Sequence, residues 1–408
     1  MESPESVSCP LALRTVRLSI YDRRASARAA SRVALQGWFM TITLDSLRRF
    51  AVARSLFKPT TLGRALDRMG FVQADPIRAP ARAQDLTLRH RVKDYRAGDL
   101  ERLYAKLDVE EDFFLVYGVV TRSLQALMHP RSDADVPAEG PRPWSAERKK
   151  RAQSVLDFIR ERGSVHPREV DDHFAHGKIR NYWGGTSNAS TQLLAAMHYR
   201  GMLRVMRREG GVRIYAAHQH GPEPADAAER LGRIHALVDA AVRIYAPLPA
   251  ACLADLVRRL RFAVPQWRSE LPSALKRAKQ RLSQARVDGI EWFWPGGESP
   301  ARAEVSDAVR LLTPFDPVVW DRDRLELLWN WVYRFEAYTP AHKRKLGYYA
   351  LPMLWRDRVI GWANLAVADG KLASEFGYIK SRMPRDRAFR LALEAEVDRI
   401  RTFMAIES

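Results

Sequence analysis

Phe71-Val72-Gln73-Ala74-Asp75-Pro76-Ile77 directly follows a short helical pattern that stops at Gly70. Proline biases the residue before it away from the helical region, and β-branched and aromatic residues favour extended backbone. Because alternate side chains of an extended segment share one face, Gln73 and Asp75 are expected to point the same way. The segment is therefore predicted to be a strand that presents a carboxamide beside a carboxylate.

Gln73 and Asp75 are the candidate catalytic residues. An amide can orient one water molecule, and a carboxylate can take its proton or stabilise a developing positive charge. The alternative is that both are surface residues at a strand end, with Asp75 serving as a turn residue before Pro76. The pattern Gln-x-Asp is too short to decide between these two interpretations by its spacing.

The chain is strongly basic, because its 408 residues include 67 Lys and Arg against 48 Asp and Glu, a formal net charge of +19. This balance makes a polyanion the expected partner, although charge alone does not separate DNA from RNA or an acidic membrane. The only cysteines are Cys9 and Cys252, which excludes a disulfide framework or a Cys-rich zinc site and fits a cytoplasmic, nucleoid-associated protein. No run of about eighteen apolar residues occurs, so neither a membrane span nor a membrane partner is expected.

The order of predicted elements indicates an α+β chain with three tandem winged-helix (helix-turn-helix) units and a C-terminal strand-rich domain. No strong residue-level repeat links the three units, so the triplication rests on element order alone. The predicted boundaries are a disordered extension at 1–42, a first winged helix with a helical extension at 43–131, a linker at 132–144, a second winged helix with a basic wing at 145–220, a third winged helix at 225–296 and a mixed β domain with a terminal helix at 300–408. Met40 is the expected natural start, and a transit-peptide-like or basic DNA-binding arm is the alternative for the segment before it.

Several elements inside these boundaries are predicted from periodicity and turn residues. Residues 99–128 are expected to form a helical section with an apolar core at 113–117. Strands at 202–207 and 212–215 are joined through Glu209-Gly210-Gly211, a hairpin signature, and form the wing of the second unit. The last domain is expected to hold strands near 309–312, 348–354, 359–366 and 372–379, and a helix at 384–403.

Basic residues near the catalytic pair and on the wing are the expected DNA contacts, because a basic hairpin can contact phosphates on both sides of a groove. A solvated basic face is the alternative for the residues at 78–91 and 342–345. The candidates are Arg78, Arg82 and Arg89, the wing residues Arg204, Arg207, Arg208 and Arg213, and the loop residues Lys343, Arg344 and Lys345.

Two histidine pairs are the candidate metal ligands, His173-x-x-His176 and His218-x-His220. Neither pair has an obvious third ligand, so no metal site is predicted. No cofactor is expected either.

The chain resembles the AlkZ/YcaQ-like winged-helix DNA glycosylases, bacterial enzymes that excise alkylated purines and unhook interstrand DNA crosslinks. The resemblance runs from about residue 44 to about residue 380. Its most specific blocks are Leu312-Thr313-Pro314-Phe315-Asp316-Pro317-Val318-Val319-Trp320-Asp321-Arg322, Tyr333-Arg334-Phe335-Glu336-Ala337-Tyr338-Thr339-Pro340 and Lys343-Arg344-Lys345-Leu346-Gly347-Tyr348, and Trp183-Gly184-Gly185 is similar too. The catalytic resemblance is Gln73-Ala74-Asp75-Pro76-Ile77, continued by Ala81-Arg82-Ala83 and Leu86-Thr87-Leu88.

The resemblance implies a C-shaped arrangement of three winged helices and a strand-rich domain around double-stranded DNA. It also implies a monofunctional glycosylase that hydrolyses the N-glycosidic bond of N7-modified purines, with Asp75 as the catalytic carboxylate and Gln73 positioning the water. A monomer is expected, since no dedicated dimerisation helix is apparent, and the alternative function is a winged-helix transcriptional regulator. The family commonly has an aromatic-His-Glu segment after the first unit, where this chain has Val116-Tyr117-Gly118-Val119 and His129 lies too far on to replace it. That departure bears on lesion preference and on crosslink activity.

Overall fold

The computed structural model describes residues 41–131, 144–175, 177–180 and 186–406. Residues 1–40 of the predicted extension, nearly all of the predicted linker, and the segment Trp183-Gly184-Gly185 lie outside these described residues.

Two helices and a short strand open the first described region. Thr43 and Ser46 form a capping box that starts the first helix, because each side chain accepts a hydrogen bond from the backbone N–H of the other. Gly70 has a φ of 70° and ends the second helix, which lets the chain enter a strand at Phe71. The elements are α2 (Leu44–Ser55), α3 (Leu62–Met69), β1 (Phe71–Gln73), α4 (Ala83–Leu88), α5 (Asp99–Leu103), β2 (Val109–Phe113), β3 (Tyr117–Thr121) and α6 (Arg122–Ala126).

The helical extension predicted over residues 99–128 is wrong in its middle, where β2 and β3 form an antiparallel hairpin. Strand β1 pairs with β3, so the order in this sheet is β1-β3-β2. Gln73 lies opposite Gly118, and a Cβ at Gly118 would lie 2.3 Å from the carbonyl oxygen of Val72. Only glycine allows this close approach, and the approach fixes the backbone that carries Gln73.

The second and third regions also place helices ahead of antiparallel strands. The second contains α7 (Ala146–Arg162), α8 (Pro167–Phe174), β4 (Lys178–Arg180), β5 (Thr186–Asn188), α9 (Ala189–Tyr199), β6 (Leu203–Glu209) and β7 (Val212–Ala217), the last two forming the predicted hairpin. The third contains α10 (Ala227–Tyr245), β8 (Leu248–Pro249), α11 (Ala250–Arg259), α12 (Leu271–Arg281), β9 (Ser283–Val287) and β10 (Ile290–Trp294), with strand order β8-β10-β9.

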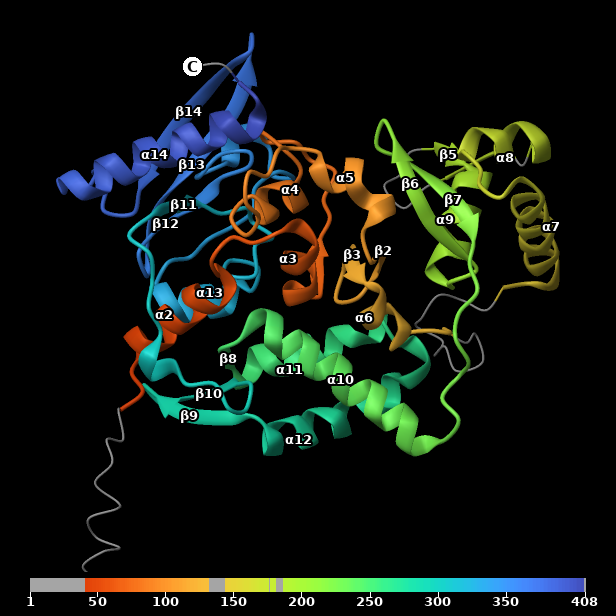
Figure 1. The fold of residues 1–408 in the computed structure, drawn as a ribbon, viewed down its shortest axis with the longest axis horizontal. Coiled ribbons are helices and arrows are strands. Elements are labelled where there is room, and N and C mark those ends of the chain that lie inside the picture. Colours follow the sequence, from red (N-terminus) through yellow and green to blue (C-terminus); the bar gives the residue numbers. More distant parts are fainter. Residues whose placement is uncertain (1–40, 132–143, 176, 181–185, 407–408) are drawn as a thin grey trace, which may run out of the picture. The chain divides into compact units, whose positions relative to one another are not determined.

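The C-terminal region is built on a four-stranded antiparallel sheet with the order β11-β12-β13-β14. Its elements are β11 (Val309–Leu311), α13 (Arg322–Trp329), β12 (Leu351–Trp355), β13 (Arg358–Ala368), β14 (Lys371–Tyr378) and α14 (Arg387–Met404), which match the predicted strands and final helix. Together with the first three regions, this sheet and its helices confirm the predicted α+β class (Figure 1).

The apolar cores show how the regions are joined. One core combines α2 and β1 with α10, α11 and α12, and another combines α3 and α4 with the C-terminal sheet and α14. A separate core belongs to the second region alone, between α7, α9 and the β6–β7 hairpin. The strand that carries the catalytic candidates is therefore fixed by packing from two sides.

Candidate active site

The segment after β1 presents Asp75 in a tight turn. The Ala74 backbone N–H still donates to the carbonyl oxygen of Tyr117, at 3.1 Å, and extends the strand by one bond. Asp75 Oδ1 then accepts from the Ile77 N–H at 2.9 Å, which is the turn chemistry expected of an aspartate before Pro76. The catalytic and turn interpretations of Asp75 are therefore compatible, because only one of its two oxygens is used by the turn.

Asp75 is half-buried and takes part in no ion pair within the described chain. Burial raises the pKa of its carboxyl above the ordinary value, and the Ile77 N–H opposes that rise. A carboxylate without a cationic partner is a stronger base than one held in a salt bridge, so its placement suits a group that must accept a proton or face a cation.

Gln73 is oriented by Trp320, a residue that is distant from it in the sequence. Its side-chain oxygen accepts a hydrogen bond of 2.8 Å from the indole N–H of Trp320. The Trp320 ring is itself packed against Tyr245, at 4.9 Å between ring centroids, and lies 5.1 Å from the Arg259 guanidinium carbon. With the carbonyl side of the amide occupied, the NH₂ group of Gln73 is left to contact a water or a substrate atom.

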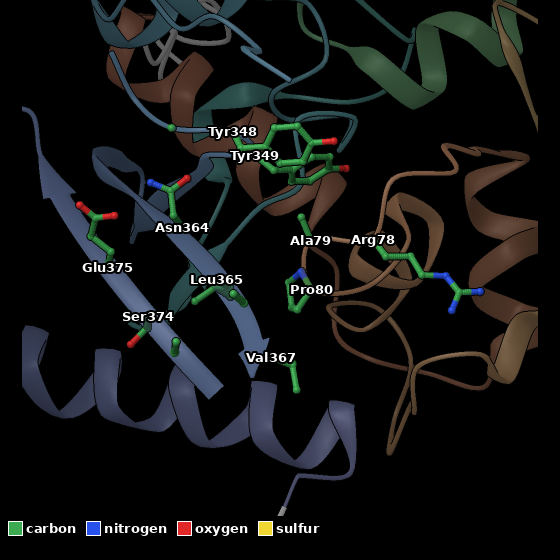
Figure 2. Close-up of a pocket in the computed structure, with 13 residues that line it drawn as sticks. Arg78, Ala79, Pro80, Tyr348, Tyr349, Asn364, Leu365, Val367, Ser374 and Glu375 are labelled. Atoms are coloured by element: carbon green, nitrogen blue, oxygen red, sulfur yellow. The ribbon is translucent and has the colours of Figure 1, made fainter. Parts of the chain in front are cut away.

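A pocket of about 680 Å³ opens beside this segment. Its walls are residues 78–80, residues 347–349 and the facing parts of β13 and β14 (Figure 2). Asp75 is not part of the wall, which begins three residues later at Arg78. Tyr349 belongs to the wall, and burial raises the pKa of its hydroxyl, with the charge of Asp75 adding to that rise. Figure 2 shows Pro80 facing β13 while the Arg78 side chain extends away from the strands.

The residues predicted to contact DNA differ in whether their side chains form an ion pair within the protein. Arg78, Lys343 and Lys345 are exposed and form no ion pair with any described residue. Arg344 donates to the Thr339 carbonyl at 2.8 Å and lies over the exposed ring of Tyr348.

Two predicted phosphate contacts near the catalytic segment are engaged inside the protein. Arg89 donates to Glu396 at 2.6 Å, and its side chain is only 4% exposed, so the prediction that it binds phosphate is wrong. Arg82 pairs with Glu101. A Cβ at Gly211, in the wing turn, would lie 2.6 Å from the Arg82 guanidinium, so the wing tip contacts Arg82 directly.

Three wing arginines also face the protein. Arg204 pairs with Glu110 at 2.5 Å, and Arg208 pairs with Glu111 at 2.5 Å. Arg213 lies 3.6 Å from Glu111 and stacks over the ring of Tyr117. Arg207 alone pairs within the wing, with Glu209, and its side chain is 45% exposed. All four wing arginines were predicted to contact DNA. For Arg204, Arg208 and Arg213 this prediction is wrong, because their guanidinium groups pair with carboxylates of β2.

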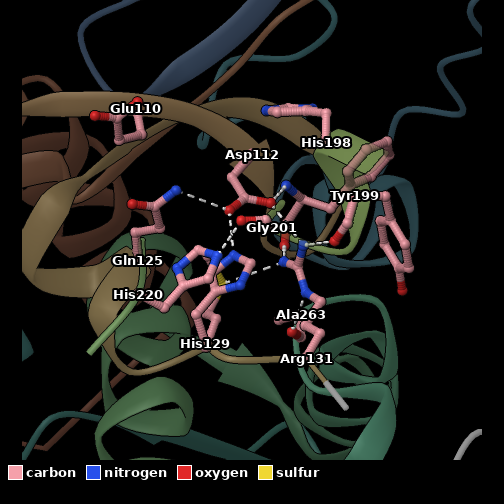
Figure 3. A network of polar contacts seen from close by, with 12 residues as sticks. Glu110, Asp112, Gln125, His129, Arg131, His198, Tyr199, Gly201, His220 and Ala263 are labelled. Atoms are coloured by element: carbon pink, nitrogen blue, oxygen red, sulfur yellow. Dashed lines mark hydrogen bonds and ion pairs between the residues drawn. The ribbon is translucent and has the colours of Figure 1, made fainter. Parts of the chain in front are cut away.

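Sequence reasoning missed the run of buried carboxylates on β2, at Glu110, Glu111 and Asp112. Asp112 accepts from Arg131 at 2.8 Å and lies 2.7 Å from His129 Nε2 (Figure 3). Burial alone would raise the pKa of Asp112, but Arg131 and His129 hold it well below its usual range. The sequence carries no local signal for this network because the partners come from α6, from the segment after α6 and from the second region.

The histidine pairs considered as metal ligands are used in stacking. His173 stacks on Phe158 at 4.4 Å, and its partner His176 lies outside the described residues. His218 contacts His220 edge-on at 4.3 Å, and His220 stacks on His129 at 4.1 Å. Over the part of the chain that the structure describes, no group of three or more His, Cys, Asp or Glu is placed to hold a metal ion. In the same part, no helix has the length and hydropathy needed to cross a membrane.

Comparison with known proteins agrees with the resemblance noted in the sequence. The model of a family described as "DNA glycosylase AlkZ-like" matches residues 66–403. The solved structure of the Streptomyces sahachiroi DNA glycosylase AlkZ is similar at a TM-score of 0.59 and 16% identity, over 90% of this chain and 98% of that one. At that identity the structural likeness concerns the fold, whereas the family match spans most of the chain. The protein therefore belongs to the AlkZ-like family and is a DNA glycosylase.

Proposed function

We propose that this glycosylase hydrolyses the N-glycosidic bond of N7-alkylated purines in double-stranded DNA, acting as a monomer with Asp75 and Gln73 at the reaction centre. The observation that carries the proposal is the half-buried carboxylate of Asp75, which has no cationic partner among the described residues and comes three residues before Arg78 in the wall of a pocket of about 680 Å³. The proposal deepens the family assignment by naming the lesion class and the two reacting residues.

The chemistry asks little of the protein beyond one negative charge and one placed water. Alkylation at N7 puts a positive charge on the purine, so the base leaves readily and the sugar becomes oxocarbenium-like. A carboxylate about 4 Å from that cation contributes on the order of 4 kcal/mol at an effective dielectric near 20, which is roughly a thousandfold in rate. Asp75 supplies this charge and takes the proton of the attacking water.

Gln73 positions the attacking water in this proposal. Its oxygen is already occupied by the Trp320 N–H at 2.8 Å, so its NH₂ group is directed by that bond. An amide held in one orientation can position a water without ordering cost at the moment of reaction.

Unhooking of interstrand crosslinks is the finer part of the proposal. A base that is covalently tied to the opposite strand cannot swing fully out of the duplex, so the enzyme must work on a lesion that stays in the helix. The pocket beside Asp75 is walled partly by the exposed residue Tyr348, which supports access to a bulky lesion from the surface.

The experiment compares Asp75→Asn with Asp67→Asn, an exposed aspartate on α3 that serves as the matched control. Abasic-site formation is measured on a duplex with N7-methylguanine and on a duplex with a crosslinked N7-guanine, and DNA binding is measured in parallel. We expect Asp75→Asn to lose about a thousandfold in single-turnover excision while binding DNA as well as the wild type. Unchanged excision in Asp75→Asn would refute the role of Asp75, and activity on the methylated duplex alone would refute crosslink unhooking.

A further inference from the structure

A second concave site lies at the opposite end of β13 from the candidate active site. This site has a volume of about 700 Å³ and is formed by Trp329 at the end of α13, the first residues of β13 and the segment 379–385 that joins β14 to α14. The active-site pocket uses residues 364–367 of the same strand, so the two are separated by roughly 15 Å along β13 at about 3.3 Å per residue. The remote site takes no part in the glycosylase chemistry described above.

More than half of the residues that line this remote site are apolar. Val359 and Ile360 come from β13, and Ile379 and Met383 come from the connecting segment. Ile379 is 38% exposed and Met383 is 43% exposed, so two large apolar side chains face a hollow instead of the core. Single exposed apolar residues are ordinary on a protein surface, but a cluster of them lining a concavity indicates a binding site.

The charged residues that line the remote site, called here its cationic rim, are all basic. Arg358, Lys380, Arg382 and Arg385 line it, and no acidic residue does. Arg358 pairs with Asp45 at 3.0 Å, whereas the other three form no ion pair with any residue in the described ranges. Arg358 also lies 3.9 Å from Asp357. Asp386, which follows Arg385, is used as the N-cap of α14, where it accepts from the Ala388 N–H at 2.7 Å.

The backbone of the connecting segment is held in place before any ligand arrives. The Ile379 N–H donates to the Ile360 carbonyl at 3.0 Å and continues the β13–β14 ladder, and the Ser381 N–H donates to the Tyr378 carbonyl at 2.9 Å. The Trp329 ring is fixed by its N–H, which donates to the Asp357 carbonyl at 2.7 Å. A ligand that enters therefore orders little of the protein, which favours binding by a short segment.

We propose that this remote site binds a short acidic peptide segment of a partner protein, with an apolar side chain in the hollow and carboxylates on the cationic rim. Charge complementarity selects an anion, since three rim cations form no ion pair with any residue that the structure describes. The apolar lining selects a peptide over DNA, because a duplex presents phosphates on a convex surface and has no apolar side chain to place in a hollow lined by Ile379 and Met383. The inference gives the glycosylase a means of recruitment that is separate from lesion recognition.

The test uses the full-length protein and a fluorescein-labelled peptide with four Asp or Glu residues followed by Leu and Phe. Fluorescence anisotropy measures its binding to the wild type, to Lys380→Glu/Arg382→Glu on the rim, to Met383→Ser in the hollow, and to Lys371→Glu, an exposed lysine at the other end of β14 that serves as the matched control. We expect the rim variant to lose at least tenfold in affinity, Met383→Ser to lose several-fold, and Lys371→Glu to match the wild type. Excision of alkylated purine from bare DNA should be equal in all four proteins.

Two further arms separate the possible occupants. A peptide with Ser in place of Leu and Phe should bind at least fivefold more weakly, because the hollow is then unfilled. Equal binding of that peptide, or equal loss with Lys371→Glu, would overturn the proposal by showing unspecific charge attraction. A rim variant that binds damaged DNA more weakly while keeping its peptide affinity would overturn it in favour of a DNA-contacting surface. All substituted residues are on the surface, and equal melting temperatures would exclude misfolding as the cause.

Discussion

The hydrogen bond between Trp320 and Gln73 is the contact that a catalytic role for the amide depends on most directly. Trp320→Phe keeps a six-membered aromatic ring to pack on Tyr245, and it removes the N–H that donates to Gln73 at 2.8 Å together with the five-membered ring that carries it. A hydrogen bond of this kind contributes about 0.5–1.5 kcal/mol, so excision should slow by roughly two- to twelvefold with KM nearly unchanged.

Trp329→Phe is the control for this substitution, because its indole N–H donates to the Asp357 carbonyl at 2.7 Å, away from Asp75. That variant should lose stability by a similar amount and keep its excision rate. Single-turnover kinetics on an N7-methylguanine duplex distinguishes the two. Equal rates for Trp320→Phe and the wild type would show that Gln73 is positioned by other means.

The residue scale also shows what the sequence can and cannot predict about the site. Pro76 and the residues before it are sufficient to predict a strand that ends near Asp75, because those preferences are local. The donor to Gln73 is not predictable in the same way, since Trp320 is distant in sequence and nothing near Gln73 encodes it. The wrong assignment of Arg89 has the same origin, because Glu396 is the residue that neutralises it.

At the scale of elements, β2 holds the second region against the first. Glu111 accepts from Arg208 at 2.5 Å, and Arg213 lies 3.6 Å away from it. Glu111→Gln keeps the shape but leaves both guanidinium groups without a counter-charge. Breaking a buried ion pair costs about 3–5 kcal/mol, and partial exposure of the two arginines reduces the expected loss to about 2 kcal/mol.

Hydrogen exchange reports where this stability is lost. We expect faster exchange over β6 and β7 in Glu111→Gln, because the hairpin then loses the ion pairs of Arg208 and Arg213 with β2 and depends on the Arg204–Glu110 pair and its own apolar core. The control is Glu209→Gln, which breaks an exposed pair with Arg207 inside the wing and should cost less than about 1 kcal/mol. Equal exchange in Glu111→Gln and the wild type would show that the ion pairs do not hold the wing.

The histidine network beside β2 predicts that stability depends on pH. Burial lowers the pKa of His129 to about 3, and neighbouring Arg131 adds to the effect. The unfolded chain binds a proton at this residue below about pH 6.5, whereas the folded chain does so only near pH 3, so acid favours unfolding. The free energy of unfolding should be greatest near neutral pH and fall below pH 6.5 by up to about 1.4 kcal/mol per pH unit for this histidine.

Urea unfolding at pH 7.5, 6.0 and 5.0 measures this dependence. His129→Gln, which keeps a donor for Asp112, should flatten the slope by about one proton. His342→Gln, a substitution of an exposed histidine, is the control and should leave the slope unchanged. A wild-type stability that is constant from pH 7.5 to 5.0 would contradict the prediction.

The elements that the sequence predicted correctly are those encoded by local periodicity. The helix α14 and the β6–β7 hairpin follow from apolar spacing and from Glu209-Gly210-Gly211, and the structure has both. The β2–β3 hairpin was mistaken for helix because Glu110, Glu111 and Asp112 do not suggest a buried strand. They become buriable only when Arg131 and the wing arginines, which lie far away in sequence, supply the opposite charge.

At the scale of the whole molecule, the net charge of +19 overstates the number of phosphate contacts. Arg89, Arg204 and Arg208 already bind carboxylates of the protein, whereas Lys343 and Lys345 are exposed and have no partner in the described part of the chain. Each phosphate contact contributes about 0.9 to the slope of log K against log salt concentration. We expect Lys343→Gln/Lys345→Gln to lower that slope by about 1.8 and to weaken binding to damaged and undamaged duplexes alike.

Arg89→Gln is the internal comparison for the salt dependence. This substitution removes the Arg89 charge and leaves the fully buried Glu396 paired with Arg399 alone, so the free energy of unfolding should fall. The salt slope of DNA binding should stay that of the wild type. Binding is measured by anisotropy of a labelled duplex between about 50 mM and 200 mM salt, the range over which counterion release dominates. The opposite result, a lower slope in Arg89→Gln and an unchanged slope in Lys343→Gln/Lys345→Gln, would contradict the prediction. The DNA would then contact the paired arginines, whose ion pairs within the protein would have to open when DNA binds.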